Sequence, residues 1–272
     1  MNLKVRGISY YFHIHQEKQA LPYLILLHGF LGSSSIFDTI INDLKKYCNP
    51  ITIDLLGHGN TEGAELHYRF STKEQVADLS KLINEQIQNP VFLYGYSMGA
   101  RLALQLAIHR SDLLSGLILE SGTFGIEGET ERQARQALDA SRSDQIMGNF
   151  HGFLKEWKMK PLFSSTLSDE DLASVVKIQQ NQNSTWMANC LLGFGTGTMP
   201  CVRERLAEII CPTQLIAGEK DSKFIRINQT MNKEISDSNL IIVKGSNHRV
   251  HLEQPQKCVE ITQNFITKHQ LL

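Results

Sequence analysis

The stretch VFLYGYSMGARLALQLAIH, residues 91–109, decides the fold of this chain. Residues 91–96 form an apolar run with the length of a strand that is buried on both faces. Residues 98–109 continue with the apolar spacing of a helix. Between them lies GYSMG (95–99), a GxSxG string at a strand-to-helix junction. Such a junction predicts a sharp turn that exposes the hydroxyl of Ser97 above the sheet edge, because side chains in place of the two glycines would collide with neighbouring elements.

Similar apolar runs recur along the chain, most of them separated by helical patterns. The runs are YLILL (23–27), ITIDLL (51–56), GLILES (116–121), TQLIAG (213–218) and NLIIVKG (239–245), and further helical patterns lie at 72–89 and 255–267. Strands that alternate with helices predict a mostly parallel sheet covered by helices on both faces, with ligands bound at the carboxyl ends of the strands. Because the serine turn lies at that same edge, the pattern predicts an α/β-hydrolase fold.

The alternation stops between about residues 122 and 205, where helical and turn patterns occur without a buried strand. We therefore expect a helical cap, 122–205, inserted into a hydrolase core made of 1–121 and 206–272. Because the chain has no low-complexity tract or flexible linker, the cap should pack on the core.

Composition excludes several classes of partner. The 272 residues include 27 lysines and arginines against 28 acidic residues, so no net field would draw the chain to nucleic acid or to an anionic membrane. The five cysteines form no CxxC pair, and no apolar run approaches the roughly eighteen residues of a membrane span. We expect a soluble cytoplasmic enzyme, a monomer or weak homodimer, that acts on a small molecule. No cofactor or metal is expected, because His248, His251 and Glu253 lack further ligands at a known zinc spacing.

A serine hydroxyl becomes reactive when an oriented imidazole takes its proton. In this fold the chain order is serine, acid, histidine. His248 follows the last apolar run and is the favoured base, with His251 as the alternative. Asp221 is the favoured acid because it lies beyond the end of run 213–218, whereas Glu219 is close enough to the run to face away.

Backbone amides near Ser97 predict an oxyanion hole. The loop after run 23–27 begins His28-Gly29-Phe30 and offers the amide of Phe30 opposite that of Met98. Two donors aimed at one oxygen stabilise negative charge in a transition state. His28 is expected to hold this loop by hydrogen bonds, and is also a candidate for contact with substrate.

The arginines indicate the kind of substrate. Arg101 lies one helical turn beyond Ser97, where it could clamp a carboxylate beside the reacting hydroxyl. The alternative is a surface ion pair. Arg132 and Arg135 share a face of the expected first cap helix, which could look into the cleft or simply be solvated.

Taken together, several strings resemble a known family. They are LHGF (27–30), DLLGHG (54–59), GYSMGAR (95–101), LES (119–121), GTGTMP (195–200), AGEKDSKF (217–224) and HRVHLEQP (248–255). They resemble the 2-succinyl-6-hydroxy-2,4-cyclohexadiene-1-carboxylate (SHCHC) synthases of menaquinone biosynthesis over nearly the whole chain. LHGF and GxSxG occur throughout the superfamily, whereas GYSMGAR joined to GEKDSKF and a late HxxH is more particular.

The resemblance implies a lyase that eliminates pyruvate from 2-succinyl-5-enolpyruvyl-6-hydroxy-3-cyclohexene-1-carboxylate without consuming water. Ser97, activated by His248 and Asp221, would remove a ring proton. The substrate carries three carboxylates, and the family's substrate-binding residues match Arg101, Arg135, Tyr96 and Trp157 here.

One departure from the family affects binding. A cap arginine that the family uses on substrate falls at Gln179 in this chain, so one carboxylate would lose a charged partner, and Lys177 is a weaker candidate to replace it.

Two other functions use the same scaffold. A carboxylester or carbon–carbon bond hydrolase would be served equally well by the triad. A binding protein on an inactive hydrolase scaffold is disfavoured, because nucleophile, acid and base are all present.

Overall fold

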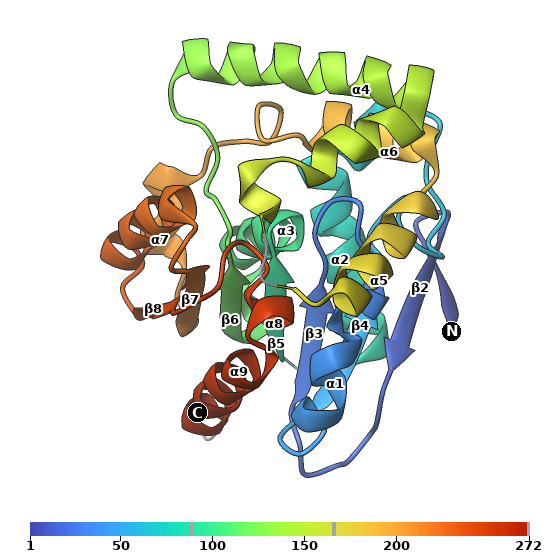
Figure 1. Cartoon of the computed structure of the whole chain (residues 1–272). Helices are drawn as coiled ribbons and strands as arrows, with labels where there is room; N and C mark the ends of the chain where they lie inside the picture. Colours follow the sequence, from blue (N-terminus) through green and yellow to red (C-terminus); the bar gives the residue numbers. More distant parts are fainter. Residues whose placement is uncertain (88–89, 165–166, 271–272) are drawn as a thin grey trace.

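A computed structural model describes residues 1–87, 90–164 and 167–270 of the chain. Within these residues a single sheet has the strand order β1-β2-β4-β3-β5-β6-β7-β8 (Figure 1). The strands are β1 (Asn2–Val5), β2 (Ile8–Ile14), β3 (Tyr23–Leu27), β4 (Asn49–Ile53), β5 (Val91–Tyr96), β6 (Leu114–Glu120), β7 (Thr213–Gly218) and β8 (Ser238–Val243). Strands β3 to β8 pair in parallel, while β2 is antiparallel to both β1 and β4. The prediction of a mostly parallel sheet is confirmed.

The apolar runs predicted from sequence are the six parallel strands, with ends that differ by a few residues. Strands β1 and β2 were not predicted. Their residues alternate between buried and exposed positions and include charged and polar side chains, so they lack the continuous apolar run of a doubly buried strand. An edge hairpin of this kind gives a weak hydropathy signal.

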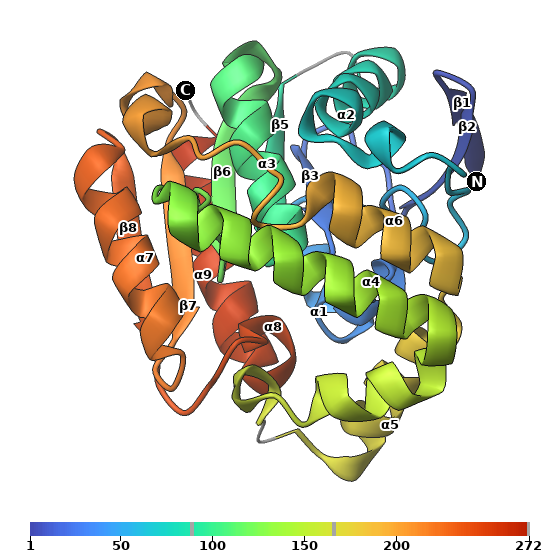
Figure 2. The same cartoon turned by 90° about the horizontal axis from the view of Figure 1, so that it is seen from above.

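Helices cover both faces of the sheet (Figures 1 and 2). Helices α2 (Thr72–Gln86), α3 (Met98–His109) and α7 (Ser222–Glu234) pack on one face, and α1 (Asp38–Leu44) and α9 (Pro255–His269) on the other. The run of β3 is apolar throughout because both faces of the strand are buried. Ile25 and Leu27 belong to the core under α2 and α3, whereas Leu24 and Leu26 belong to the core under α1 and α9. The predicted helix 72–89 is α2, and residues 88 and 89 of that prediction lie outside the described residues.

Shorter helices complete the connections. They are α8 (Val250–Glu253) and the 3-10 helices η1 (Ser34–Phe37), η2 (His67–Phe70), η3 (Ser111–Leu113), η4 (Pro161–Phe163) and η5 (Arg203–Glu208).

Three helices lie over the carboxyl ends of the parallel strands (Figure 2). They are α4 (Glu129–Lys158), which bends at Asn149, α5 (Asp169–Gln180) and α6 (Ser184–Phe194). An apolar cluster joins α4 and α6 to the core through Leu31, which follows β3 and packs with Ile146 of α4 and Met187 of α6. Helix α5 packs through Val175 in the apolar cluster that also contains α1 and α9. We call residues 122–205, which include these helices, the cap; these boundaries remain a prediction.

The described residues offer neither a membrane-spanning helix nor a cluster of metal ligands. None of the helices there is both long and apolar enough to cross a membrane. The same residues contain no group of histidine, cysteine and acidic side chains arranged to hold a metal ion.

Candidate active site

Ser97 occupies the turn between β5 and α3. Its backbone has φ 52° and ψ −103°, a left-handed conformation that non-glycine residues rarely adopt. The glycines on either side are required by space. A Cβ on Gly99 would overlap the carbonyl oxygen of Leu27, and a Cβ on Gly95 would crowd the backbone of Gly99 and Ala100. The tight turn keeps the Ser97 hydroxyl at the sheet edge, where it lines a cavity.

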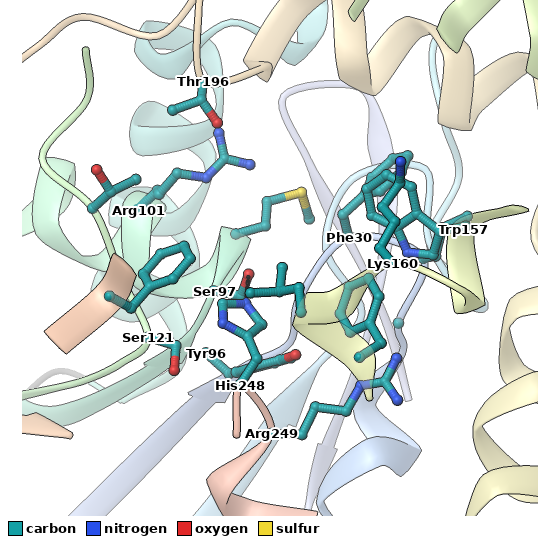
Figure 3. Close-up of a pocket in the computed structure, with 18 of the residues that line it drawn as sticks. Phe30, Tyr96, Ser97, Arg101, Ser121, Trp157, Lys160, Thr196, His248 and Arg249 are labelled. Carbon is teal, nitrogen blue, oxygen red and sulfur yellow. Dashed lines mark hydrogen bonds between the residues drawn. The ribbon is translucent and has the colours of Figure 1, made fainter. Parts of the chain in front are cut away.

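The structure brings Ser97, His248 and Asp221 into one hydrogen-bonded row (Figure 3 shows Ser97 and His248). The Nδ1–H of His248 donates to Asp221 Oδ2 at 2.7 Å, and His248 Nε2 lies 3.0 Å from Ser97 Oγ. Asp221 Oδ1 also accepts from the backbone amide of Phe224 at 3.4 Å, which orients the carboxylate. Because Nδ1 is committed to a carboxylate, Nε2 is free to accept the proton of the serine.

The two alternative residues lie elsewhere. Glu219 Oε2 accepts from the backbone amide of Gly245 at 3.0 Å, and its side chain is exposed. His251 is fully buried and its Nδ1 bonds Glu120 instead. Neither makes a hydrogen bond to Ser97 or His248 in the described part of the chain.

The amides expected to form an oxyanion hole are available. Phe30 and Met98 both line the cavity beside Ser97. No acceptor within the described residues takes up either backbone N–H. The arrangement can therefore offer two donors to an anionic oxygen held near the serine hydroxyl.

His28 has no route to a ligand. It is fully buried, its Nδ1–H donates to the carbonyl of Gly29 at 2.8 Å, and its Nε2 accepts from the amide of Leu55 at 2.9 Å. Burial lowers the pKa of His28 to about 4, so the ring is neutral. The expectation that it could contact substrate is wrong, because backbone groups use both ring nitrogens. Its role is to hold the loop after β3.

The cavity above the triad is strongly cationic. It has a volume of about 370 Å³, a size suited to a small metabolite. Six of the described residues that line it carry positive charge, and none carries negative charge. The six are Arg101, Arg135, Arg142, Lys160, Lys223 and Arg249.

Arg101 is a cavity residue and not part of a surface ion pair. Its Nη1 donates to the carbonyl of Phe194 at 2.7 Å, and its guanidinium lies 4.8 Å from the centroid of the Phe194 ring. No acidic side chain forms an ion pair with it among the described residues. Burial, and next the charge of Arg135, lower its pKa to about 10. A ligand carboxylate would relieve both effects.

Arg135 and Arg142 share one acidic partner on α4. Arg135 Nε contacts both oxygens of Asp139, at 2.9 and 2.8 Å, and Arg142 Nη1 lies 3.2 Å from Oδ1 of the same carboxylate. Two guanidinium groups against one carboxylate leave a net positive charge at the cavity roof. Arg132 points away and pairs with Glu129 at the surface.

Two lysines extend the positive lining. The pKa of Lys160 is lowered by burial and then by the charge of Arg142. The pKa of Lys223 is lowered by partial desolvation and then by the charge of Arg135. Cations that depress one another's pKa values create a site that favours an anion.

Aromatic side chains also line the cavity. Trp157 lies edge-on to Phe30, with ring centroids 5.6 Å apart, and Lys160 lies 5.2 Å from the Trp157 centroid (Figure 3). The Tyr96 ring packs against His248 at 5.6 Å. These predicted substrate-binding residues therefore lie in the same cavity as Ser97.

Comparison with known proteins agrees with this geometry. The profile of the alpha/beta hydrolase family matches residues 24–261. The chain belongs to the alpha/beta hydrolase family.

Within this family, the chain is similar to SHCHC synthases. A Bacillus subtilis (strain 168) protein that carries this name provisionally is 36% identical over 247 residues, which cover 90% of each chain. The Serratia proteamaculans (strain 568) protein of the same name is 26% identical over 255 residues, covering 93% of this chain and 96% of that one. The solved structure of MenH from S. aureus matches with a TM-score of 0.91 at 30% identity, covering 96% of this chain and 98% of that chain.

The prediction that Lys177 replaces the family's cap arginine, which falls at Gln179 here, is wrong. Gln179 lines the cavity and is buried, whereas Lys177 is exposed on α5 and does not line it. Four other cations supply additional positive charge: Arg142, Lys160, Lys223 and Arg249.

Four of the six cavity cations were not predicted from sequence. Arg142 follows Arg135 by seven residues, two helical turns along the same face, so helical spacing could have identified it. Arg249 is the residue after His248, and its guanidinium lies 4.4 Å from the centroid of the Phe163 ring. Lys160 follows the end of α4 and gives no periodic signal. The fourth is Lys223, in the first turn of α7.

Proposed function

We propose that this protein eliminates pyruvate from 2-succinyl-5-enolpyruvyl-6-hydroxy-3-cyclohexene-1-carboxylate and releases SHCHC. The observation that carries the proposal is the cavity lining: among the described residues, six cationic side chains and no acidic one line the cavity at the Ser97–His248–Asp221 row. A substrate with three carboxylates matches that charge. The similarity to proteins named SHCHC synthases supports the same assignment.

The names of substrate and product define the bonds that change. The ring carbon that bears the succinyl group loses a proton, the carbon–oxygen bond to the enolpyruvyl group breaks, and the ring gains a second double bond. His248 takes the Ser97 proton, and the resulting alkoxide removes the ring proton. His248 then returns its proton to the departing enolpyruvate, which becomes pyruvate. No water is consumed and no acyl-enzyme forms.

Proton removal next to the succinyl ketone places negative charge on the ketone oxygen. The amides of Phe30 and Met98 would donate to that oxygen, and each such donor is typically worth about 3 kcal/mol in a transition state. Arg101, one turn of α3 beyond Ser97, would bind a carboxylate close to the reacting carbon, and Arg135 would bind another from the cap. Trp157 and Tyr96 would pack against the ring.

The direct test is a reaction of the purified protein with the enolpyruvyl substrate. We expect the conjugated diene and pyruvate to form in equal amounts, and we expect both to form about a thousandfold or more slowly with Ser97→Ala. Turnover of aryl esters far faster than the elimination would favour the alternative, a carboxylester hydrolase. Absence of elimination above background would refute the proposal.

A further inference from the structure

We propose that Glu120 is a positioning residue that fixes the serine turn and the histidine loop relative to each other. The inference rests on the proposed roles of Ser97 and His248. Glu120 ends β6, between the strand that carries Ser97 and the strand that precedes Asp221. The cluster beneath the triad that it forms with His251 and Tyr94 takes no part in the mechanism above.

The main chain of Glu120 holds the nucleophile. Its carbonyl oxygen accepts from the backbone amide of Ser97 at 2.9 Å. This bond continues the parallel pairing of β5 and β6 to the point where the backbone turns into its strained conformation. Any shift of Glu120 would therefore move the serine.

The side chain of Glu120 holds the segment that carries the base. Its Oε1 accepts from the backbone amide of His251 at 3.2 Å, and its two oxygens lie 3.0 and 2.9 Å from His251 Nδ1. His251 belongs to α8, which begins two residues after His248. One residue thus bonds both the Ser97 turn and the short helix that follows the catalytic imidazole.

The Tyr96 ring occupies the space between the two histidines. Its centroid lies 4.6 Å from that of His251 and 5.6 Å from that of His248. A displacement of the His251 imidazole would therefore be transmitted by direct packing to the ring that must face Ser97.

The burial of the cluster argues against a role in stability alone. Glu120 and His251 are both fully buried, and the hydroxyl of Tyr94 also donates to Glu120 Oε2. No lysine or arginine pairs with Glu120 among the described residues. A buried carboxylate of this kind commonly contributes less to stability than apolar residues of similar size would, whereas its several acceptor sites define a geometry.

The test measures the rate at which a fluorophosphonate labels Ser97, since that rate reports on the triad without the proposed substrate. Glu120→Leu removes the acceptors, and we expect labelling of the folded protein to slow by about 10- to 100-fold, the effect of misplacing a reacting group by about 1 Å. Glu120→Gln keeps an oxygen for the His251 donors, and should stay within about threefold of the wild-type rate. The measurement is made well below the unfolding temperature of each variant.

Two further variants separate positioning from lost stability. Ile261→Ala leaves a space in the apolar core beside α9 and removes none of the hydrogen bonds that Glu120 accepts, so it should lower the unfolding temperature and leave the labelling rate unchanged. His251→Phe keeps a ring against Tyr96 but removes the side-chain donor to Glu120, and should slow labelling even if Glu120→Leu does not fold.

Each outcome decides the matter. Wild-type labelling rates in Glu120→Leu, or in His251→Phe if the former is unfolded, would overturn the proposal. A rate for Glu120→Gln as slow as that for Glu120→Leu would also overturn it, because acceptor geometry would then not be what matters. Failure of the wild-type protein to be labelled at all would instead refute the proposed role of Ser97.

Discussion

Replacing Arg101 by methionine should remove most activity while leaving the protein about as stable as before. The side chain lies in the cavity beside Ser97 and bonds a backbone carbonyl, that of Phe194, with no acidic partner among the described residues. Its desolvated charge therefore destabilises the unliganded protein and stabilises the complex with an anionic substrate.

The magnitude follows from the pKa and the contacts. A fall in the pKa of Arg101 from 12.5 to about 10 corresponds to about 3 kcal/mol against the charged form. Because the pKa is lowered on folding, this penalty applies at every pH below about 10, where the side chain is charged in both states. Methionine removes the penalty and also a charged hydrogen bond of about 1.5–3 kcal/mol. The two nearly cancel, so we expect the unfolding temperature to change by less than about 3 °C.

Activity should respond differently, because the substrate carboxylate would lose its partner. Loss of one member of a buried charge pair typically costs about 2–5 kcal/mol, so kcat/KM should fall by roughly 30-fold to several thousandfold. The assay pairs kcat/KM for pyruvate release with thermal unfolding, and Arg132→Met, a change at a surface ion pair, serves as control. The reasoning would be refuted if Arg101→Met kept kcat/KM within threefold of wild type, or if it unfolded many degrees lower.

Three further outcomes can be checked with the same protein. Ser97→Ala should lower kcat by about a thousandfold or more with an unchanged unfolding temperature, and a smaller loss would contradict the base role. We expect succinate to inhibit by binding the cationic lining, and this inhibition should weaken at alkaline pH as the lysines lose their charge. Arg142→Gln removes a charge that lowers the pKa of Lys160, so inhibition of this variant should persist to higher pH than that of the wild-type protein. Gln179→Arg adds a cation to the lining and should lower KM by about 3- to 10-fold while lowering the unfolding temperature, and an unchanged KM would place the carboxylates elsewhere.

The parallel core could be predicted because its physical signal is local. A strand buried on both faces is apolar at nearly every position, so β3, β5 and the second half of β7 were visible as continuous apolar runs. The hairpin β1–β2 lies at the sheet edge, and its half-exposed residues carry no such run. The sequence therefore predicted the parallel strands β3 to β8, which carry the candidate site, and did not predict the hairpin β1–β2, which lies away from it.

The row of Ser97, Asp221 and His248 was predictable for a different reason. Each of the three residues lies within three residues after the end of a predicted parallel strand. The carboxyl ends of parallel strands lie at the same edge of a sheet, so the three residues are expected near one another. Chain order alone then separated Asp221 and His248 from most other acids and histidines. No tertiary knowledge beyond the sheet direction was needed.

The cavity roof could not be predicted in the same way. Lys160 is placed by the bend of α4 at Asn149 and by the packing of the helix end against the core, neither of which has a period in the sequence. The same packing decides that Gln179 faces inward and that Lys177, two residues earlier, faces solvent. Long-range contacts therefore determine which cap charges reach the substrate.

The net charge of the chain, −1, gives no sign of the cationic cavity on which the proposed function depends. In the part of the chain that the structure describes, six of the 27 lysines and arginines line one cavity and no acidic residue does, so 21 cationic residues remain against 28 acidic ones. The rest of the molecule is thus net negative and the cavity lining positive, a separation that only the fold creates. Such an arrangement gives little long-range attraction for an anion and strong attraction inside, where salt screens charges less than at the surface. Selectivity for a polycarboxylate would therefore arise after entry, from the number of cations that the cavity brings within reach of one small ligand.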